Sequence, residues 1–252
     1  FYYLFLLIPL FLITGPALPD IVITFGLIFG IIYFVYYNEY SELIKINFIR
    51  VSFIFWLSLI FISFFSYNKT NSFQDALIFI RFLFIPILCY FIFFKKRKLF
   101  KQTLFVITIL VIFVCIDSFY QFLNYTPENG FGRDLLGFKS NWYGRLTGPF
   151  GDELIPGSYI SKFGLLGFAF LISIKKFENK IIFYSLYLSS ILFISFISGE
   201  RMAFATFGLS LIFLFLFLNG FRKSIFLSII FGVFFILLAT YLHPSYNDFK
   251  VV

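Results

Sequence analysis

The residue types best suited to chemistry lie in the longest polar stretch of an otherwise apolar sequence. This stretch runs from Trp142 to Tyr159 (WYGRLTGPFGDELIPGSY) and contains Arg145, Asp152 and Glu153. Its glycines let backbone N–H groups approach an anion, and a guanidinium can bind two oxygens of one anion. We predict that Arg145 binds a polar substrate and that Asp152 and Glu153 are catalytic groups that bind a sugar or orient a hydroxyl. A solvated pair of adjacent carboxylates is the competing interpretation.

A second short polar segment, Ser198-Gly199-Glu200-Arg201, separates two almost wholly apolar runs. A guanidinium at this position can bind phosphate oxygens bidentately, which a lysine cannot do. We predict that Arg201 is both catalytic and substrate-binding, and that Glu200 is a second catalytic residue. The alternative is that Arg201 is an interfacial anchor paired with Glu200.

Two ionisable residues fall inside predicted apolar helices. Arg81 lies about five residues into one helix, roughly 8 Å down at 1.5 Å per residue. An ionisable group at that depth needs a partner or a water-filled cavity. We predict a substrate-binding role for Arg81, with a snorkelling side chain or a structural pair with Asp75 or Asp117 as the alternative. For Asp117 itself, a structural ion pair and a catalytic role both remain open.

Metal and cofactor chemistry has little support in the composition. The single histidine, His243, excludes a His-rich metal site within this chain, and Cys89 and Cys115 lack metal or redox spacing. We predict no metal site and no cofactor. His243 itself is interpreted most simply as a helix-end residue, with a catalytic role as the alternative.

The composition excludes an ordinary soluble domain. Mean hydropathy is +0.97, and only 13% of residues are charged, against about 25% in soluble domains. The apolar runs approach the ~18–20 residues of a membrane-spanning helix and lack the alternation of barrel strands. The net charge of +8 comes from basic residues between apolar runs, a pattern of membrane orientation rather than of nucleic-acid binding. We predict a bilayer-embedded chain with no nucleic-acid partner.

The fold class predicted from these runs is all-α, a polytopic transmembrane helical bundle that forms one integral domain over residues 1–252. Ser72 is the expected N-cap of the fourth helix, and both ends of the chain are expected to be truncated. About nine spans are predicted, at residues 1–14, 21–37, 51–67, 72–94, 103–123, 156–174, 181–198, 202–218 and 224–242.

The distribution of basic residues predicts the sidedness of these spans. The positive-inside rule places the connections richest in Lys and Arg in the cytoplasm, among them Lys45, Arg97, Lys98, Lys175 and Lys223. The loop at 124–155, the turn at 198–201 and the segment at 243–252 then face outward. Three arginines on one side, at 81, 145 and 201, favour a polyanionic, lipid-borne substrate whose diphosphate leaving group they would stabilise.

Four short motifs carry a resemblance to a known family: Asp117–Gln121 (DSFYQ), Arg145–Phe150 (RLTGPF), Ser198–Arg201 (SGER) and Gly15–Ala17 (GPA). At these residues the chain resembles the O-antigen ligase and O-antigen polymerase family of bacterial inner-membrane proteins. The family's motif at Arg201 has a small residue before and often after the arginine, whereas Glu200 and Met202 flank it here. The resemblance rests mainly on residues 117–210.

The resemblance implies a GT-C-type membrane glycosyltransferase core that works without a metal in lipopolysaccharide or polysaccharide biosynthesis. A glycan would pass from undecaprenyl diphosphate to a hydroxyl of lipid A–core or of a second lipid-linked glycan, at the periplasmic face of the inner membrane. Arg201 would contact the diphosphate with help from Arg145 and Arg81, while Asp152, Glu153 or Glu200 would position the arginines or the sugar. The general base is expected in a large loop that begins at 243–252 and continues past the end of this sequence.

Two other function classes compete with this interpretation. A transporter or flippase for a lipid-linked or anionic substrate would favour polar residues near the bilayer midplane and broken helices. A purely structural membrane subunit would need neither a buried Arg81 nor two further arginines on one side. The choice between ligase and polymerase stays open.

Overall fold

The computed structural model describes residues 2–15, 17–37, 47–83, 97–142, 144–174 and 180–247. The sequence predictions at Cys89, at Lys45 and Lys175, and for the second half of the helix at 72–94 lie outside these residues. The chain divides into two compact units, Phe1–Leu12 with Pro16–Phe100, and Ile13–Gly15 with Lys101–Val252. Each unit is described by itself, and the prediction of one integral domain stays a prediction.

The first unit is helical. It contains α1 (Tyr2–Phe11), α2 (Ala17–Tyr36), α4 (Asn47–Ser63) and α5 (Lys69–Ile78); η1 (Leu12–Thr14), which follows α1, falls across the division between the units. The Trp56 indole N–H donates to the Ala76 carbonyl at 2.9 Å and joins α4 to α5. Asn68, and not Ser72, caps α5: its side chain accepts the backbone N–H of Asn71 at 3.4 Å. Ser72 lies within the helix, where its hydroxyl bonds that of Ser66 at 2.7 Å.

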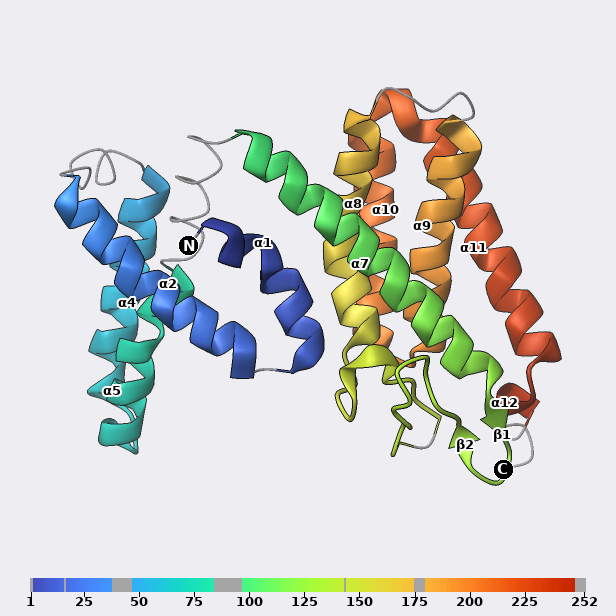
Figure 1. Cartoon of the computed structure of the whole chain (residues 1–252), viewed down its shortest axis with the longest axis horizontal. Helices are drawn as coiled ribbons and strands as arrows, with labels where there is room; N and C mark the ends of the chain where they lie inside the picture. The colour runs from blue at the N-terminus through green and yellow to red at the C-terminus, as the bar shows by residue number, and fades with distance from the viewer. Residues whose placement is uncertain are drawn as a thin grey trace. The chain divides into compact units, whose positions relative to one another are not determined.

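The second unit is a helical bundle with a small hairpin at one end (Figure 1). Its helix α9 packs against α8, α10 and α11. Aromatic contacts join α7 to α8 through Phe105 and Phe170 and to α9 through Phe119 and Phe193. The elements are α7 (Arg97–Leu123), β1 (Tyr125–Thr126), β2 (Gly130–Phe131), η2 (Gly148–Phe150), α8 (Pro156–Ser173), α9 (Lys180–Ile197), α10 (Arg201–Phe217), η3 (Asn219–Phe221), α11 (Arg222–Leu242) and α12 (Pro244–Asn247).

Glycines and serines account for the close packing around α9. A methyl group on Gly164 of α8 would lie 2.5 Å from Ile191, and one on Gly232 of α11 would lie 2.5 Å from Leu192. Small residues let apolar helices approach closely, as in membrane bundles. The buried Ser185 hydroxyl lies within hydrogen-bonding distance of two carbonyl oxygens, Ile181 O of its own helix and Ser224 O of α11, so its single proton has an acceptor.

Three helices are long and apolar enough to cross a membrane: Arg97–Leu123, Lys180–Ile197 and Asn219–Leu242. The prediction of about nine spans is therefore wrong for the residues that the structure describes. The apolar helices α4 and α10 are shorter, with 17 residues each. At 1.5 Å per residue each reaches about 26 Å, less than the ~30 Å hydrocarbon core. Helix α8 has 18 residues but carries Lys162 together with several serines and glycines.

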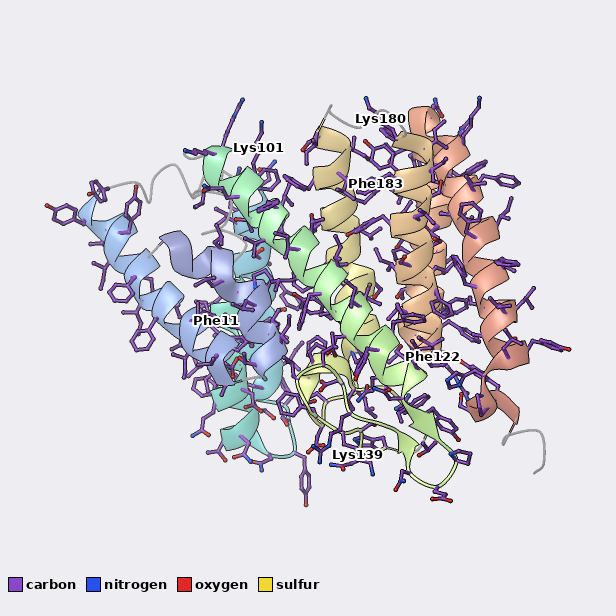
Figure 2. All side chains as sticks on the ribbon, turned by 45° about the vertical axis from the view of Figure 1, so that its right-hand side comes forward. Phe11, Lys101, Phe122, Lys139, Lys180 and Phe183 are labelled. Carbon is purple, nitrogen blue, oxygen red and sulfur yellow. The ribbon has the colours of Figure 1, made fainter. Side chains whose placement is uncertain are left out.

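The connection between α7 and α8 contains more structure than a loop. Strands β1 and β2 pair antiparallel, with Tyr125 opposite Phe131, and an isolated bridge joins Arg133 to Lys139. Figure 2 shows Lys101 and Lys180 at the end of the second unit opposite Lys139 and Phe122. The connection therefore lies at the same end of the bundle as the turn between α9 and α10.

Candidate functional site

The turn between α9 and α10 is built by its glycine. Helix α9 ends at Ile197, and Gly199 adopts a φ of +78°, which a residue with a side chain rarely takes. Glu200 then occupies the N-cap position of α10, and its carbonyl accepts the N–H of Phe204 at 3.1 Å. The sharp turn places Arg201 at the first position of the new helix, where its side chain is exposed.

The Glu200 carboxylate caps a different helix, α8. Its Oε1 accepts the backbone N–H of Gly157 at 2.7 Å, and its Oε2 accepts both the N–H of Ser158, at 3.1 Å, and the Ser158 hydroxyl. Ile155, at the N-cap position of α8, has no capping side chain, and Pro156 has no N–H. Glu200 thus supplies the cap that the local sequence lacks, with its negative charge at the positive end of the helix.

Gly157 is required by this close approach. A methyl group at Gly157 would lie 2.5 Å from the Ser198 hydroxyl oxygen and 3.0 Å from Glu200 Oε1. Ser198 itself is buried and donates to Ser195 O at 2.9 Å, so it cannot move away freely. The start of α8 and the turn after α9 are therefore held together at a glycine.

Arg145 reaches the same turn from the connection between α7 and α8 (residues 124–155), which we call the outer loop after its predicted sidedness. Its Nη2 donates to the carbonyl of Gly199 at 3.2 Å, and its own carbonyl accepts the Ser140 hydroxyl at 2.7 Å. The rest of the Arg145 guanidinium is exposed. Two arginines far apart in sequence, Arg145 and Arg201, are thereby brought to one turn.

Both arginines line a cavity of about 1070 Å³. Gly144, Gly199 and Glu200 form part of the same wall. Arg201 makes no hydrogen bond or ion pair with any residue that the structure describes, and no carboxylate pairs with Arg145 there. We call this cavity the arginine pocket. Its two guanidinium groups have unused N–H donors, so it is suited to an anion with several oxygen acceptors.

The far wall of the arginine pocket comes from the segment after α11, with Ser245 and Tyr246. Burial raises the pKa of Tyr246 to about 12, so its phenol is neutral at pH 7. Ser245 is buried, and its hydroxyl bonds His243 Nδ1 at 2.7 Å. His243 Nε2 bonds the carbonyl of Phe122 at 2.9 Å, which requires the proton on Nε2 because a carbonyl only accepts. His243 Nδ1 is then the acceptor of the Ser245 hydroxyl.

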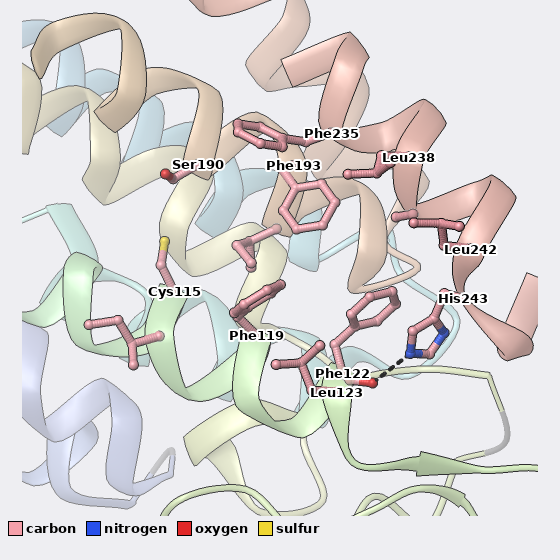
Figure 3. A pocket seen from close by; sticks show the side chains of 13 residues that line it. Cys115, Phe119, Phe122, Leu123, Ser190, Phe193, Phe235, Leu238, Leu242 and His243 are labelled. Atoms are coloured by element: carbon pink, nitrogen blue, oxygen red, sulfur yellow. Dashed lines mark hydrogen bonds between the residues drawn. The ribbon is translucent and has the colours of Figure 1, made fainter. Parts of the chain in front are cut away.

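A second, apolar cavity of about 540 Å³ lies between α7, α9 and α11 (Figure 3). His243 lies at one end of it, with a hydrogen bond to Phe122, and aromatic side chains such as Phe119, Phe193 and Phe235 line the rest. Burial lowers the pKa of His243 below its ordinary value of 6.5, because a charged imidazole is poorly solvated there; the bond to Phe122 partly opposes this shift. His243 is therefore mainly neutral at pH 7.

The motif at 117–121 anchors the outer loop rather than lining the arginine pocket. Gln121 Oε1 accepts the backbone N–H groups of Thr147 and Gly148 at 3.1 and 2.9 Å, and Asp117 Oδ1 accepts the N–H of Leu135 at 2.9 Å. Gln121 has no role in our sequence prediction. The available signal was its spacing, because Asp117 and Gln121 are four residues apart on one helix face just before the loop.

Asp152 and Glu153 lie outside the arginine pocket. Both are exposed, and Asp152 Oδ1 accepts the Asn141 amide at 2.6 Å while its carbonyl accepts the Trp142 indole N–H at 3.2 Å. Neither carboxylate forms an ion pair with Arg145 or Arg201 among the described residues. Their predicted catalytic role stays a prediction, without support from proximity.

Arg81 belongs to the first unit, so the structure does not place it relative to the arginine pocket. Its guanidinium forms an ion pair with Asp20 at 3.2 Å and contacts the Thr24 hydroxyl at 3.4 Å. The partner is thus Asp20, and not Asp75 or Asp117 as the structural alternative expected. This pairing supplies the compensation that a charge within an apolar helix needs.

The described residues contain no cluster of three or more His, Cys, Asp or Glu side chains placed to hold a metal ion. No protein-family model, curated protein or solved structure matches the chain. The resemblance to the O-antigen ligase and polymerase family therefore remains an expectation from the four motifs, and the function has to be argued from the geometry of the site.

Proposed function

We propose that the chain transfers a glycan from a polyprenyl diphosphate, such as undecaprenyl diphosphate, to a hydroxyl acceptor at the periplasmic face of a bacterial inner membrane. The observation that carries this proposal is the convergence of Arg145 and Arg201 on one cavity, with no carboxylate partner for either among the described residues. Together the two guanidinium groups match the charge of a diphosphate leaving group.

The apolar pocket suits the lipid part of such a donor. Ile194 lines the apolar cavity of Figure 3, whereas the next residue, Ser195, lines the arginine pocket. Likewise, His243 lines the apolar cavity and Ser245 lines the arginine pocket. The two cavities are therefore neighbours: one is lined by apolar side chains, and the other carries the two arginines. An amphiphile with a diphosphate head and an isoprenoid tail presents the same two surfaces.

The reaction would break the bond between the anomeric carbon and the diphosphate oxygen and form one to the acceptor oxygen. Arg145 and Arg201 would stabilise the charge on the departing diphosphate. The acceptor proton needs a base at the pocket. Neutral His243, whose Nδ1 accepts from Ser245 on the pocket wall, can take that proton through the serine hydroxyl and become an imidazolium.

A transporter or flippase is less well supported by the described helices. The charged residues of α9, α10 and α11 lie only at their first positions, Lys180, Arg201, Arg222 and Lys223. Transport of an anion favours polar groups near the bilayer midplane and interrupted helices. In these three helices the charges lie at one end of a continuous helix, which favours chemistry at the membrane surface. Ligase and polymerase activities share this donor and differ in the acceptor.

The donor is tested by binding to the purified protein in nanodiscs, with farnesyl diphosphate, farnesyl monophosphate and inorganic pyrophosphate as probes. We expect farnesyl diphosphate to bind most tightly. Inorganic pyrophosphate has no tail for the apolar cavity, and the head of farnesyl monophosphate has less charge and fewer oxygen acceptors for the two guanidinium groups. Arg145→Lys and Arg201→Lys should each weaken its binding about tenfold, or ~1.4 kcal/mol, since a lysine cannot bind bidentately. The matched control is Arg133→Lys, an exposed arginine of the same outer loop that does not line the pocket.

Transfer is then measured in cells that depend on this gene. Arg201→Lys should abolish the ligated or polymerised glycan while the protein level in the membrane is unchanged. Normal glycan in the Arg201→Lys strain, or equal binding of all three probes, would refute the proposal.

A further inference from the structure

Three buried oxygen atoms without a hydrogen-bond partner come together where α7 meets the outer loop. They are Asp117 Oδ2, Ser118 Oγ and Asp134 Oδ2, and each side chain is at most 4% exposed. Only one other buried side-chain polar atom in the described part of the chain lacks a partner, Arg81 Nε. Buried polar groups are nearly always paired with protein, water or an ion, so three unpaired oxygens at one place indicate a bound group.

Two of these oxygens share a location, and Asp134 lies beside them. A methyl group on Gly148 would lie 2.7 Å from Ser118 Oγ and 3.6 Å from Asp117 Oδ2, so both face the same point beside that glycine. The other Asp117 oxygen accepts the N–H of Leu135 at 2.9 Å, which brings the neighbouring Asp134 next to Asp117. Asp134 Oδ1 is likewise occupied, by the N–H of Phe138 at 2.6 Å. In each aspartate one oxygen is used and the other is free.

The charge of this cluster is not balanced by the protein. Asp117 and Asp134 form no ion pair with any described residue. Arg133 and Lys139, the basic residues nearest to Asp134 in the sequence, are both exposed. Two buried carboxylates without a counter-charge carry a large desolvation cost, which a cation removes.

We propose that Asp117, Ser118 and Asp134 bind a divalent cation, Ca²⁺ or Mg²⁺, which ties the outer loop to α7. Carboxylate and hydroxyl oxygens are the ligands that these hard cations prefer, with water and backbone carbonyls completing the shell. A single divalent ion matches the charge of the two carboxylates. The site is structural: none of the three residues lines the arginine pocket, so the inference stands apart from the proposed glycan transfer.

The test is thermal unfolding of the chelator-treated full chain in detergent at pH 7.5, with CaCl₂, MgCl₂ or NaCl added at constant ionic strength. We expect Ca²⁺ or Mg²⁺ at millimolar concentration to raise Tm by about 3 °C or more, because a ligand of the folded state stabilises it. Asp134→Asn and Ser118→Ala should lose most of this shift. Glu128→Gln, which removes an exposed carboxylate from the hairpin turn, should keep all of it.

Equilibrium dialysis should find one divalent ion per wild-type chain and less than a third of that in Asp134→Asn. If Asp117→Asn folds, it should lose the bound ion in the same way. If it does not fold, Ser118→Ala serves in its place, because that variant keeps both carboxylates. No Tm shift with either divalent ion, an effect of Na⁺ alone, or an equal shift in Asp134→Asn would overturn the proposal. If Tm instead rises as the pH is lowered from 7 to 5 and no cation changes it, the two aspartates share a proton rather than a cation. That result would also overturn the proposal.

Discussion

The Glu200 carboxylate accepts the backbone N–H of Gly157 at 2.7 Å, although 43 positions of the chain separate the two residues. This bond joins the turn that carries Arg201 to the start of α8, directly after the outer loop that carries Arg145. The acidic residue of the SGER motif thus uses both carboxylate oxygens to cap α8, and its predicted catalytic role stays a prediction. It is a positioning residue for the arginine pocket.

We expect Glu200→Gln to destabilise the protein by about 1–3 kcal/mol. The amide loses the negative charge at the start of α8 and turns an N–H₂ group toward a backbone N–H that needs an acceptor. The free energy of unfolding in mixed micelles measures the loss. Glu153→Gln, at an exposed carboxylate, should stay within about 0.5 kcal/mol of wild type. Equal losses in the two variants would contradict the capping role.

Gln121→Ala should release the outer loop from α7. The variant leaves the backbone N–H groups of Thr147 and Gly148 buried without an acceptor, at a cost of about 2–4 kcal/mol. Hydrogen exchange of residues 144–150 is the measurement, and we expect faster exchange there than in wild type. Tyr120→Phe, on the exposed face of the same helix, is the control. Unchanged protection in Gln121→Ala would show that the glutamine does not hold this loop.

The contribution of His243 to the stability of the wild type should be lost as the pH drops from 7 toward 5. Burial lowers the pKa of His243, so the folded protein binds fewer protons than the unfolded chain in this range. Stability is then fully present above the unfolded pKa of about 6.5 and is lost as the pH falls through it toward the folded pKa. His243→Gln should show a flatter curve, because His243 is the only histidine of the chain. An equally steep fall in the variant would assign the effect to other groups.

The sidedness of the bundle can be read by cysteine labelling in a background in which Cys89 and Cys115 are replaced by serine. A membrane-impermeant maleimide should label Asp152→Cys in intact spheroplasts and Lys180→Cys only after permeabilisation. The reason is that basic connections stay in the cytoplasm, and Lys180 opens α9 at the end opposite the outer loop. The reverse labelling pattern would refute the periplasmic assignment of the arginine pocket.

The helices of the second unit were largely predictable from the sequence. The predicted spans at 156–174, 181–198, 202–218 and 224–242 differ from α8 to α11 by at most two residues at each end. Their ends are marked by local signals, namely Pro156, Gly199 and the basic residues around 222. The number of membrane spans was overestimated, because apolar composition alone does not make a helix long enough to cross a bilayer.

The sequence by itself determined the all-α class, the apolar helices, and the grouping of polar residues into two segments between apolar runs, because composition and the positions of glycine, proline and charge act locally. Only the tertiary structure decided which partner each polar side chain takes: Gly157 for Glu200, Gly199 for Arg145, and Asp20 for Arg81. These partners lie more than 40 positions apart in the sequence. Hydrogen bonds and ion pairs depend on a few ångströms of distance, and that distance is set by how the helices pack and where the chain turns.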